Sequence, residues 1–367
     1  MTEHLKYFTW PAIAGLLAAL LILDRWVLPA SDGSSAGQRA PVSYARAVAA
    51  ASPAVVNIYT AKVVRERYNP LLNDFLTRRL AQRTPRQRIE RSLGSGVIMS
   101  AEGHVLTNHH VIAGADAIQV LLHDGRSATA VVVGSDPATD LAVLQVSLPE
   151  LTPIAIGDSN SARVGDVVLT IGNPLGFGHS VSQGIISALG RYGLQLSAYE
   201  DYIQTDAIIH QGNSGGALID TDGRLLGINS LIYTSGNDNA PVATGIGISL
   251  AIPVNLAVFV MNDLLEYGEV IRGWLGVSVE PTMTSSGGQA LRVIAVAADS
   301  PAERAGIRGG DIITHIDGEI VRDGRLTMHR IAQLRPGDTI SISVQREQQS
   351  LELRTVVGIQ GQSSPAR

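Results

Sequence analysis

The pattern of hydrophobic and polar positions along this chain predicts many short β-strands separated by tight turns. Ala117–Leu122 and Ala128–Val133 are rich in apolar residues and flank a turn at Asp124-Gly125, which is typical of a β-hairpin. Other short apolar runs follow turn residues at 55–58, 141–146, 167–171 and 225–228. Because few segments show helical spacing, we expect a mostly β chain, a barrel or a sandwich, and not an α/β protein.

Helical spacing is confined to a few places, and these divide the chain. Residues 45–51 are predicted to form a short helix before the first strand, and Ala257–Tyr267 a helix that closes the first folded unit. A second unit runs from Gly273 to about Gly358, with helices predicted at Pro301–Gly306 and Leu326–Leu334.

The N-terminal segment carries a charge-free apolar run from Tyr7 to Leu23. As a helix it would span roughly 25 Å, slightly less than a hydrocarbon core, and 26–28 could extend it if Asp24 and Arg25 reach the interface. We therefore expect residues 1–30 to be a transmembrane signal anchor, with Lys6 favouring an N-terminus on the inside. A cleaved signal peptide is the alternative, although no A-x-A-like site follows closely. A buried core helix fits a segment followed by a polar spacer poorly.

Two polar segments are expected to lie outside the folded units. Residues 31–42 begin with SDGSSAGQ, which is the composition of a flexible linker. Residues 62–91 carry nine Lys and Arg residues against three Asp and Glu residues. We interpret this basic segment as a solvated surface loop, and contact with membrane headgroups is the alternative.

Composition narrows the class of protein further. The chain has 367 residues, of which 45% are hydrophobic and 17% charged, so it can bury a sizeable core in two or three folded units. Its formal net charge of −5 gives no indication of nucleic-acid binding. The absence of cysteine excludes disulfides, thiolate metal sites and cysteine nucleophiles.

The stretch Gly212-Asn213-Ser214-Gly215-Gly216 carries the clearest chemical signal. A serine nucleophile needs backbone N–H groups that converge on the developing oxyanion, and glycines permit that backbone. A plain turn is the alternative for this stretch alone. His110 in T-N-H-H-V-I offers a base, and Asp140 in T-D-L-A offers a carboxylate to orient it. The order His, Asp, Ser is one of those known for such triads.

The neighbouring histidines also suggest a metal site. For His109 and His110, however, no third ligand lies at helical spacing and no H-E-x-x-H motif occurs. We therefore expect no metal and no other cofactor.

Taken together, T-N-H-H-V-I, T-D-L-A-V-L and G-N-S-G-G-A-L look like the catalytic motifs of the HtrA/Deg serine proteases, which have a chymotrypsin-like double β-barrel. Downstream, S-P-A-E-R-A-G-I and G-G-D-I-I resemble that family's PDZ domain. The resemblance covers about residues 43–358. It implies a trypsin-like protease domain at 43–268, a PDZ domain at 269–358 and a flexible tail at 359–367. With the anchor, this layout is similar to that of the family's membrane-anchored stress sensors.

The resemblance assigns roles at matching positions. His110 fills the H of the N-H-V pattern and would be the general base, Asp140 would orient it, and Ser214 would attack the peptide carbonyl. His109 would be a structural histidine. His210 stands where a small polar residue is expected and would be a surface or loop residue.

The oxyanion hole and the substrate pocket follow from the same resemblance. The backbone N–H groups of Gly212 and Ser214, with Asn213 as a further candidate, would form the hole. A neutral Asn213 cannot form the ion pair that activates chymotrypsin-type zymogens, so activation is expected to come from the PDZ domain. Ile209 and Ile248 match S1 pocket positions and imply a small aliphatic P1 residue, with core packing as the alternative.

The PDZ domain would bind the C-terminus of a peptide. Its carboxylate would lie on the loop Trp274-Leu275-Gly276-Val277, and Met328 and Ile331 would line the pocket for the last side chain unless they are ordinary core residues. Arg191 lies in a loop similar to the one that senses PDZ occupancy in stress-sensing members, with a plain exposed turn arginine as the alternative.

The resemblance therefore implies a homotrimeric serine endopeptidase, anchored in the inner membrane with its catalytic and PDZ domains in the periplasm. C-terminal peptides of misfolded outer-membrane proteins would activate it to cleave a membrane-spanning anti-sigma factor and start an envelope-stress response. Alternatives are a broad-specificity quality-control protease or chaperone and a non-catalytic peptide-binding scaffold.

Overall fold

The computed structural model describes residues 14–19, 43–65, 87–173, 178–194, 196–197, 199–210, 212–232, 248–284, 287–321, 324–347 and 349–359. Residues 1–44 form one unit and residues 45–367 another. In the first, residues 14–19 are helical, and none of the helices in the described residues has the length and apolar character needed to span a membrane. Most of the predicted anchor, all of the 31–42 linker, residues 66–86 of the basic segment and residues 360–367 of the tail lie outside the described residues.

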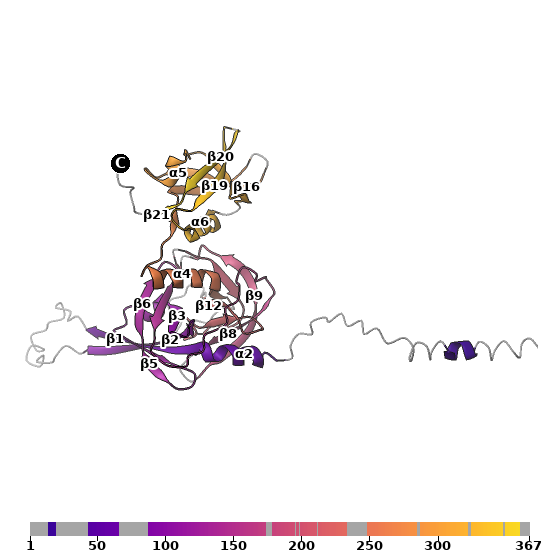
Figure 1. Cartoon of the computed structure of the whole chain (residues 1–367), viewed down its shortest axis with the longest axis vertical. Helices are drawn as coiled ribbons and strands as arrows, with labels where there is room; N and C mark the ends of the chain where they lie inside the picture. The colour runs from indigo at the N-terminus through magenta and orange to yellow at the C-terminus, as the bar shows by residue number, and fades with distance from the viewer. Residues whose placement is uncertain are drawn as a thin grey trace, which may run out of the picture. The chain divides into compact units, whose positions relative to one another are not determined.

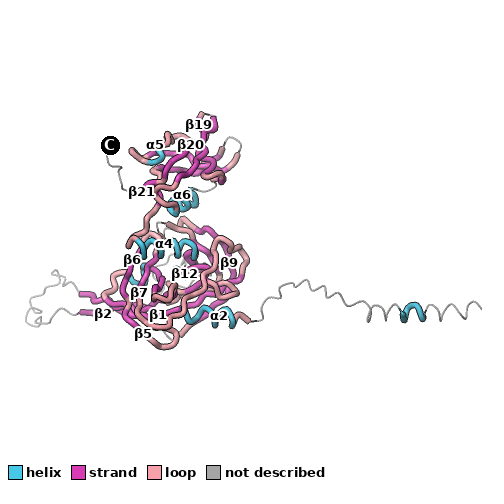
Figure 2. Tube along the Cα trace, in the orientation of Figure 1, coloured by secondary structure: helices cyan, strands magenta, loops and turns pink. Residues whose placement is uncertain are grey.

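The described chain is mostly β, as predicted, with few and short helices (Figure 2). After α2 (Ala45–Ala51) and a 3-10 turn (Ser52–Ala54), seven strands form one antiparallel sheet in the order β5-β4-β1-β2-β3-β7-β6 (Figure 1). Their bounds are β1 (Val55–Arg65), β2 (Gln87–Ile98), β3 (His104–Asn108), β4 (Ala117–Leu121), β5 (Ser127–Thr129), β6 (Val131–Asp136) and β7 (Leu141–Gln145).

Residues 167–253 contain a closed barrel in the order β10-β13-β12-β11-β8-β9. Its strands are β8 (Val167–Gly172), β9 (Ser180–Arg191), β10 (Tyr202–Thr205), β11 (Ala217–Ile219), β12 (Leu225–Ile232) and β13 (Ser249–Pro253). A cluster of apolar side chains is buried within the barrel and stabilises it by the hydrophobic effect. It includes Val168, Ile186, Ile203 and Leu218.

Several predicted elements differ in extent from the observed ones, and two of these differences have a local cause. The predicted strand 128–133 divides at Ala130, which is buried and donates its N–H to the Ile118 carbonyl, so that β5 pairs with β4 while β6 pairs with β7. The predicted helix at Ala257 begins earlier, as α4 (Val254–Glu266), directly after Pro253. Proline is favoured at a helix N-terminus because the first helical N–H groups have no intrahelical partner.

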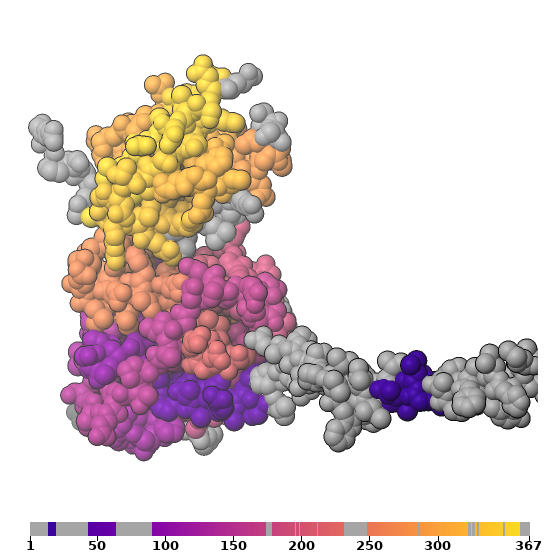
Figure 3. All heavy atoms as spheres, turned by 45° about the vertical axis from the view of Figure 1, so that its right-hand side comes forward, coloured from indigo at the N-terminus to yellow at the C-terminus, as the bar shows by residue number. Residues whose placement is uncertain are grey.

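Residues 273–359 have a core of their own. A sheet in the order β15-β16-β17-β19-β20, with β18 paired to β17, packs with α5 and α6 around buried side chains such as Leu291, Ile342 and Val344. Figure 3 shows its orange and yellow residues gathered in one body. The bounds are β14 (Gly273–Trp274), β15 (Val277–Met283), β16 (Gln289–Val296), α5 (Pro301–Arg304), β17 (Ile312–Ile316), β18 (Glu319–Ile320), α6 (Gly324–Gln333), β19 (Thr339–Arg346), β20 (Gln349–Val356) and β21 (Gly358–Ile359).

His179 connects the barrel to the first strand. Its Nε2 lies 2.9 Å from the Val55 carbonyl oxygen, so this nitrogen carries the hydrogen and donates it, and its ring stacks on His123 with 5.9 Å between centroids. Burial lowers the pKa of His179, the hydrogen bond to Val55 opposes this, and His123 lowers it further. The folded state therefore favours the neutral imidazole.

We expect acid to destabilise the fold through His179. Because its folded pKa lies below the unfolded value of about 6.5, its contribution is present above that pH and is lost as the pH falls through the folded pKa. His179→Gln keeps a donor for Val55 but cannot titrate, so its Tm should fall less than that of the wild type between pH 7.5 and 5.0, by about 2 °C. Scanning fluorimetry checks this, with the exposed His210→Gln as the control. Equal acid shifts in both variants would contradict the role of His179.

Candidate active site

His110 and Asp140 are brought together by the pairing of two strands. β3 ends at Asn108, which lies opposite Leu141 of β7, so the residues just beyond the end of β3 face the residue that precedes β7. The Nδ1 of His110 lies 2.8 Å from Oδ2 of Asp140, and the His110 backbone N–H donates to Oδ1 at 2.9 Å. Since a carboxylate only accepts, Nδ1 carries the hydrogen, and Nε2 of the neutral ring is left as a base.

Asp140 adopts an unusual backbone that its neighbours hold in place. Its φ is 59°, in the left-handed region that aspartate tolerates better than most residues. The Asp140 carbonyl accepts the side-chain amide of Asn108 at 3.0 Å and the backbone N–H of His109 at 3.1 Å. These contacts aim the carboxylate at His110 and fix it there.

Ser230, on β12, completes the surroundings of the carboxylate. Its hydroxyl donates to Oδ2 of Asp140 at 3.3 Å, and the residue is fully buried. Sequence reasoning did not find Ser230, because it lies 90 positions from Asp140 in a strand whose sequence carries no catalytic pattern. Ser230 and Asp140 become neighbours only in the folded chain, so no local sequence pattern could identify Ser230.

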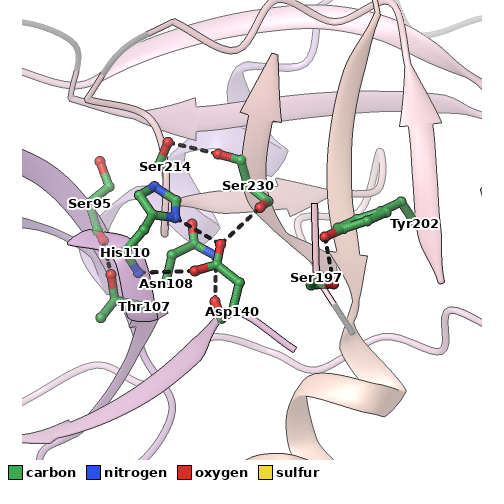
Figure 4. A network of polar contacts seen from close by, with 9 residues as sticks. All are labelled: Ser95, Thr107, Asn108, His110, Asp140, Ser197, Tyr202, Ser214 and Ser230. Carbon is green, nitrogen blue, oxygen red and sulfur yellow. Dashed lines mark hydrogen bonds and ion pairs between the residues drawn. The ribbon is translucent and has the colours of Figure 1, made fainter. Parts of the chain in front are cut away.

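Ser214 lies beside His110, whose ring stands between Ser214 and Asp140 (Figure 4). The Ser214 hydroxyl donates to the Ser230 carbonyl at 2.8 Å. To transfer its proton to Nε2 of His110, the hydroxyl must give up this acceptor and direct its hydrogen at the imidazole. The hydrogen bond between His110 and Asp140 is therefore formed, whereas the Ser214 hydroxyl is bonded to Ser230 and not to His110.

The turn around Ser214 presents backbone donors. Gly212 has a φ of 97°, and among the described residues neither its amide nor that of Ser214 donates a hydrogen bond. The amide of Asn213 instead donates to the His210 carbonyl at 2.9 Å, so it is engaged in this geometry, and its role as a further oxyanion donor stays a prediction. Two N–H groups are left that can stabilise a developing oxyanion.

The predicted S1 residues lie close together. The backbone N–H of Ile209 donates to the Ser249 hydroxyl at 3.2 Å, which places Ile209 against the residue that follows Ile248. Ile209 is fully buried, while Ile248 is half-buried. Both side chains are apolar, so a pocket that they line would favour an aliphatic group.

The predicted carboxylate loop of the PDZ unit has open donors. Leu275 and Gly276 connect β14 to β15, and within the described residues their amides donate no hydrogen bond, whereas their carbonyls accept from Ala302 and Ala297. Gly276 has a φ of 79°, and a Cβ there would lie 2.3 Å from the Ser300 Cβ, so only glycine fits. Trp274 ends β14 and Val277 begins β15.

The two predicted pocket residues on α6 have different surroundings. Met328 is half-buried, whereas Ile331 belongs to the domain core. Ile331 also lines a cavity of about 320 Å³ between α6 and the β17–β18 hairpin, together with Ile316, Val321 and Leu334, and Met328 is absent from the described lining. Ile331 therefore has the surroundings of an ordinary core residue, which was the alternative interpretation for it.

The remaining candidates are Arg191, His210 and His109. Arg191 ends β9, is exposed, and donates from Nε to the Gln204 side chain at 2.7 Å. His210 is exposed, and the Nδ1 of His109 is buried with no hydrogen-bond partner among the described residues. Over the same residues, no three His, Cys, Asp or Glu side chains group in a way that could hold a metal ion.

Comparisons with known proteins agree with this arrangement. Residues 94–228 match a trypsin-like peptidase domain family, and residues 273–357 match a PDZ domain family. The chain is 41% identical to the serine endoprotease DegS of Escherichia coli K12 over 325 residues, which cover 86% of each chain. It is 36% identical to a probable periplasmic serine endoprotease, DegP-like, of Halomonas elongata, over 98% of this chain and 76% of that one.

Solved structures extend the similarity to three dimensions. The HtrA-type protease AlgW with a decapeptide has 46% identity, covers 88% of this chain and 100% of that chain, and gives a TM-score of 0.70. A serine endoprotease from Yersinia pestis has 40% identity, covers 88% and 99%, and gives a TM-score of 0.60.

Proposed function

This chain belongs to the HtrA family of serine proteases, close to DegS and AlgW, and from that premise we propose that it is an endopeptidase whose activity is switched on by peptides bound to its PDZ domain. The observation that carries the proposal is the contact of His110 with Asp140 beside Ser214, in a chain that also carries a peptide-binding domain. A protease with such a domain has a second site through which a ligand can shift the equilibrium of the first.

In the proposed reaction, Ser214 attacks the peptide carbonyl while Nε2 of His110 takes its proton. Asp140, bound to Nδ1–H, stabilises the imidazolium that forms, and His110 returns the proton to the leaving amine. The amides of Gly212 and Ser214 bind the oxyanion of the tetrahedral intermediate. Water repeats the sequence on the acyl-enzyme, which regenerates Ser214.

The proposed specificity is for a small aliphatic P1 side chain. Ile209 and Ile248 would line the S1 pocket, where an apolar side chain gains by leaving water, and neither residue carries a charge that would bind Lys or Arg.

The proposed activator is a free C-terminal peptide. Its carboxylate would bind the open amides of Leu275 and Gly276, its backbone would add to a sheet edge, and Met328 would contact its last side chain. The solved structure of AlgW is described as a complex with a decapeptide, which supports a peptide ligand for this domain. Arg191 would then report occupancy to the protease domain.

The proposed cellular role follows from the relatives. The DegP-like relative is named as periplasmic, which supports a periplasmic location for the two folded domains. We include in the proposal the N-terminal anchor at 1–30, a homotrimer, misfolded outer-membrane proteins as the source of the peptide, and a membrane-spanning anti-sigma factor as substrate.

The test is cleavage of a periplasmic anti-sigma domain by the full chain in detergent micelles. A porin-like peptide with a free C-terminus should raise kcat/KM at least about tenfold, because the ligand shifts a population toward the active state. The same peptide with a C-terminal amide is the matched control and should have no effect, since it lacks the carboxylate. Equal cleavage without peptide would contradict the switch and favour a quality-control protease. Failure of a fluorophosphonate probe to label Ser214 would favour a scaffold.

A further inference from the structure

Ser95 lies on β2, outside the catalytic motifs, yet it contacts the turn that carries Ser214. It is fully buried, and its backbone N–H donates to the Ser214 carbonyl at 2.8 Å. Its hydroxyl donates to the Gly212 carbonyl at 2.7 Å, although 117 positions separate the two residues. Ser95 therefore holds two successive parts of the turn through two different groups.

The hydroxyl fixes the orientation of one peptide plane. The plane that joins Gly212 to Asn213 has its carbonyl on Ser95 and its N–H on the His210 carbonyl, so both ends are bound. The amide of Gly212 lies next to this plane, at a φ of 97° that only glycine adopts freely. Because Gly212 has no Cβ to restrict rotation, the two hydrogen bonds that hold this plane, from Ser95 and to His210, also restrict ψ at Gly212 and with it the direction of the adjoining Gly212 N–H.

The same hydroxyl connects the turn to the loop that follows β8. It accepts the backbone N–H of Asn173 at 3.0 Å, and the Asn173 side chain in turn accepts the N–H of Gly178 at 3.0 Å. Close packing supports this connection, since a Cβ on Gly172 would lie 2.8 Å from the Asn213 Cα. One hydroxyl thus satisfies a donor in the loop and an acceptor in the turn.

Loss of the hydroxyl would leave both groups without a partner in a buried place. A buried carbonyl or N–H that loses its hydrogen bond costs about 1–3 kcal/mol, and the Gly212 carbonyl can recover a partner only by rotating. Such a rotation would break the bond from the Asn213 N–H to His210 and change ψ at Gly212, so the preceding peptide plane, which carries the Gly212 N–H, would no longer be held at the oxyanion position. The backbone N–H of Ser95 would survive a change to alanine, so the substitution isolates the hydroxyl.

We propose that Ser95 is a positioning residue for the oxyanion turn, which acts by holding the Gly212 carbonyl and not by touching the substrate. The proposal rests on the proposed function, in that the turn must bind an oxyanion for its orientation to affect rate. It predicts that the hydroxyl stabilises the transition state and contributes little to substrate binding.

The test compares steady-state kinetics of the peptide-activated full chain with and without the hydroxyl. Ser95→Ala should lower kcat by roughly 10- to 100-fold, somewhat less than loss of an oxyanion donor itself, while KM stays within about twofold. A peptide aldehyde, which forms the tetrahedral adduct, should lose affinity by a similar factor. Ser95→Cys keeps a side chain of comparable shape with a weaker donor, so its kcat should lie between those of the wild type and Ser95→Ala.

The matched control is Thr170→Val. Thr170 is also fully buried, and its hydroxyl donates to the carbonyl of Ile208 at 3.0 Å, four positions before Gly212 in the same segment. Its kcat should stay within about threefold of the wild type, because its loss does not free the Gly212 carbonyl. An unchanged kcat in Ser95→Ala, or an equal fall in Thr170→Val, would overturn the assignment. A wild-type chain that neither cleaves nor is labelled would instead overturn the proposed function on which it rests.

Discussion

Replacing Ser214 with alanine is expected to lower kcat by about 10⁵- to 10⁶-fold, with residual activity from the oxyanion turn alone. The substitution removes the hydroxyl oxygen to which the proposed mechanism assigns the attack on the peptide carbonyl. It leaves the backbone of the turn in place, because the bond from Ser95 goes to the Ser214 carbonyl and Gly215 donates to the Asn229 carbonyl. Steady-state cleavage with the activating peptide present measures the effect.

The control for Ser214→Ala is peptide binding by the PDZ domain, which should be unchanged in calorimetry. Labelling by a fluorophosphonate probe should disappear altogether, since the probe needs a nucleophilic oxygen. Activity within tenfold of the wild type would show that another group carries out the hydrolysis. Ser230 is the hydroxyl to examine in that case, because it donates to the same carboxylate.

The resting position of the Ser214 hydroxyl gives this prediction a structural background. The hydroxyl is bound to the Ser230 carbonyl, so the serine must lose one hydrogen bond before it can form another with His110. His110 and Asp140 need no such change. If a ligand activates the chain as proposed, the serine and its turn are the parts of the described triad that it would have to reorganise, which is a small conformational step.

Much of this site could be predicted from local sequence. The motifs around His110, Asp140 and Ser214 mark positions where the chemistry demands one residue type, and the strand after Asp140 was predicted from its apolar run. The strand before His110 was not predicted. β3 and β7 pair as neighbours, so the contact between His110 and Asp140 follows once the sheet forms. The side chains that the family resemblance singled out, His110 and Asp140, therefore lie in contact, and their catalytic roles stay predictions.

The supporting contacts could not be predicted in this way. Ser95 and Ser230 lie in strands, and their hydroxyls act on groups 117 and 90 positions away. A buried serine on a strand carries no local pattern that distinguishes a structural hydroxyl from a positioning one. Nor does the sequence of the turn reveal that the amide of Asn213 is directed at His210, since backbone direction there depends on contacts across the two halves.

Asparagine at position 140 is expected to lower kcat by about 10⁴-fold while the fold stays intact. One oxygen of Asp140 accepts the backbone N–H of His110, and the other accepts Nδ1–H and the Ser230 hydroxyl. An amide has one oxygen and one NH₂, so its NH₂ must face a group that itself donates a hydrogen bond. If the oxygen keeps the backbone N–H, the NH₂ faces Nδ1, and the imidazole must move its hydrogen to Nε2. It can then no longer accept a proton from Ser214.

Asparagine should nevertheless be accepted by the backbone at this position. It tolerates the left-handed region about as well as aspartate, and the bonds from Asn108 and His109 to the residue 140 carbonyl do not depend on the side chain. The matched control is Asp220→Asn, where one side-chain oxygen accepts two hydrogen bonds, from the backbone N–H groups of Asp222 and Arg224. That variant should keep kcat within about twofold of the wild type, since the loss in Asp140→Asn comes from the wrong tautomer. A decrease in kcat of less than tenfold in Asp140→Asn would mean that His110 does not serve as the base. An equal loss of Tm in both variants would assign the loss of activity to folding.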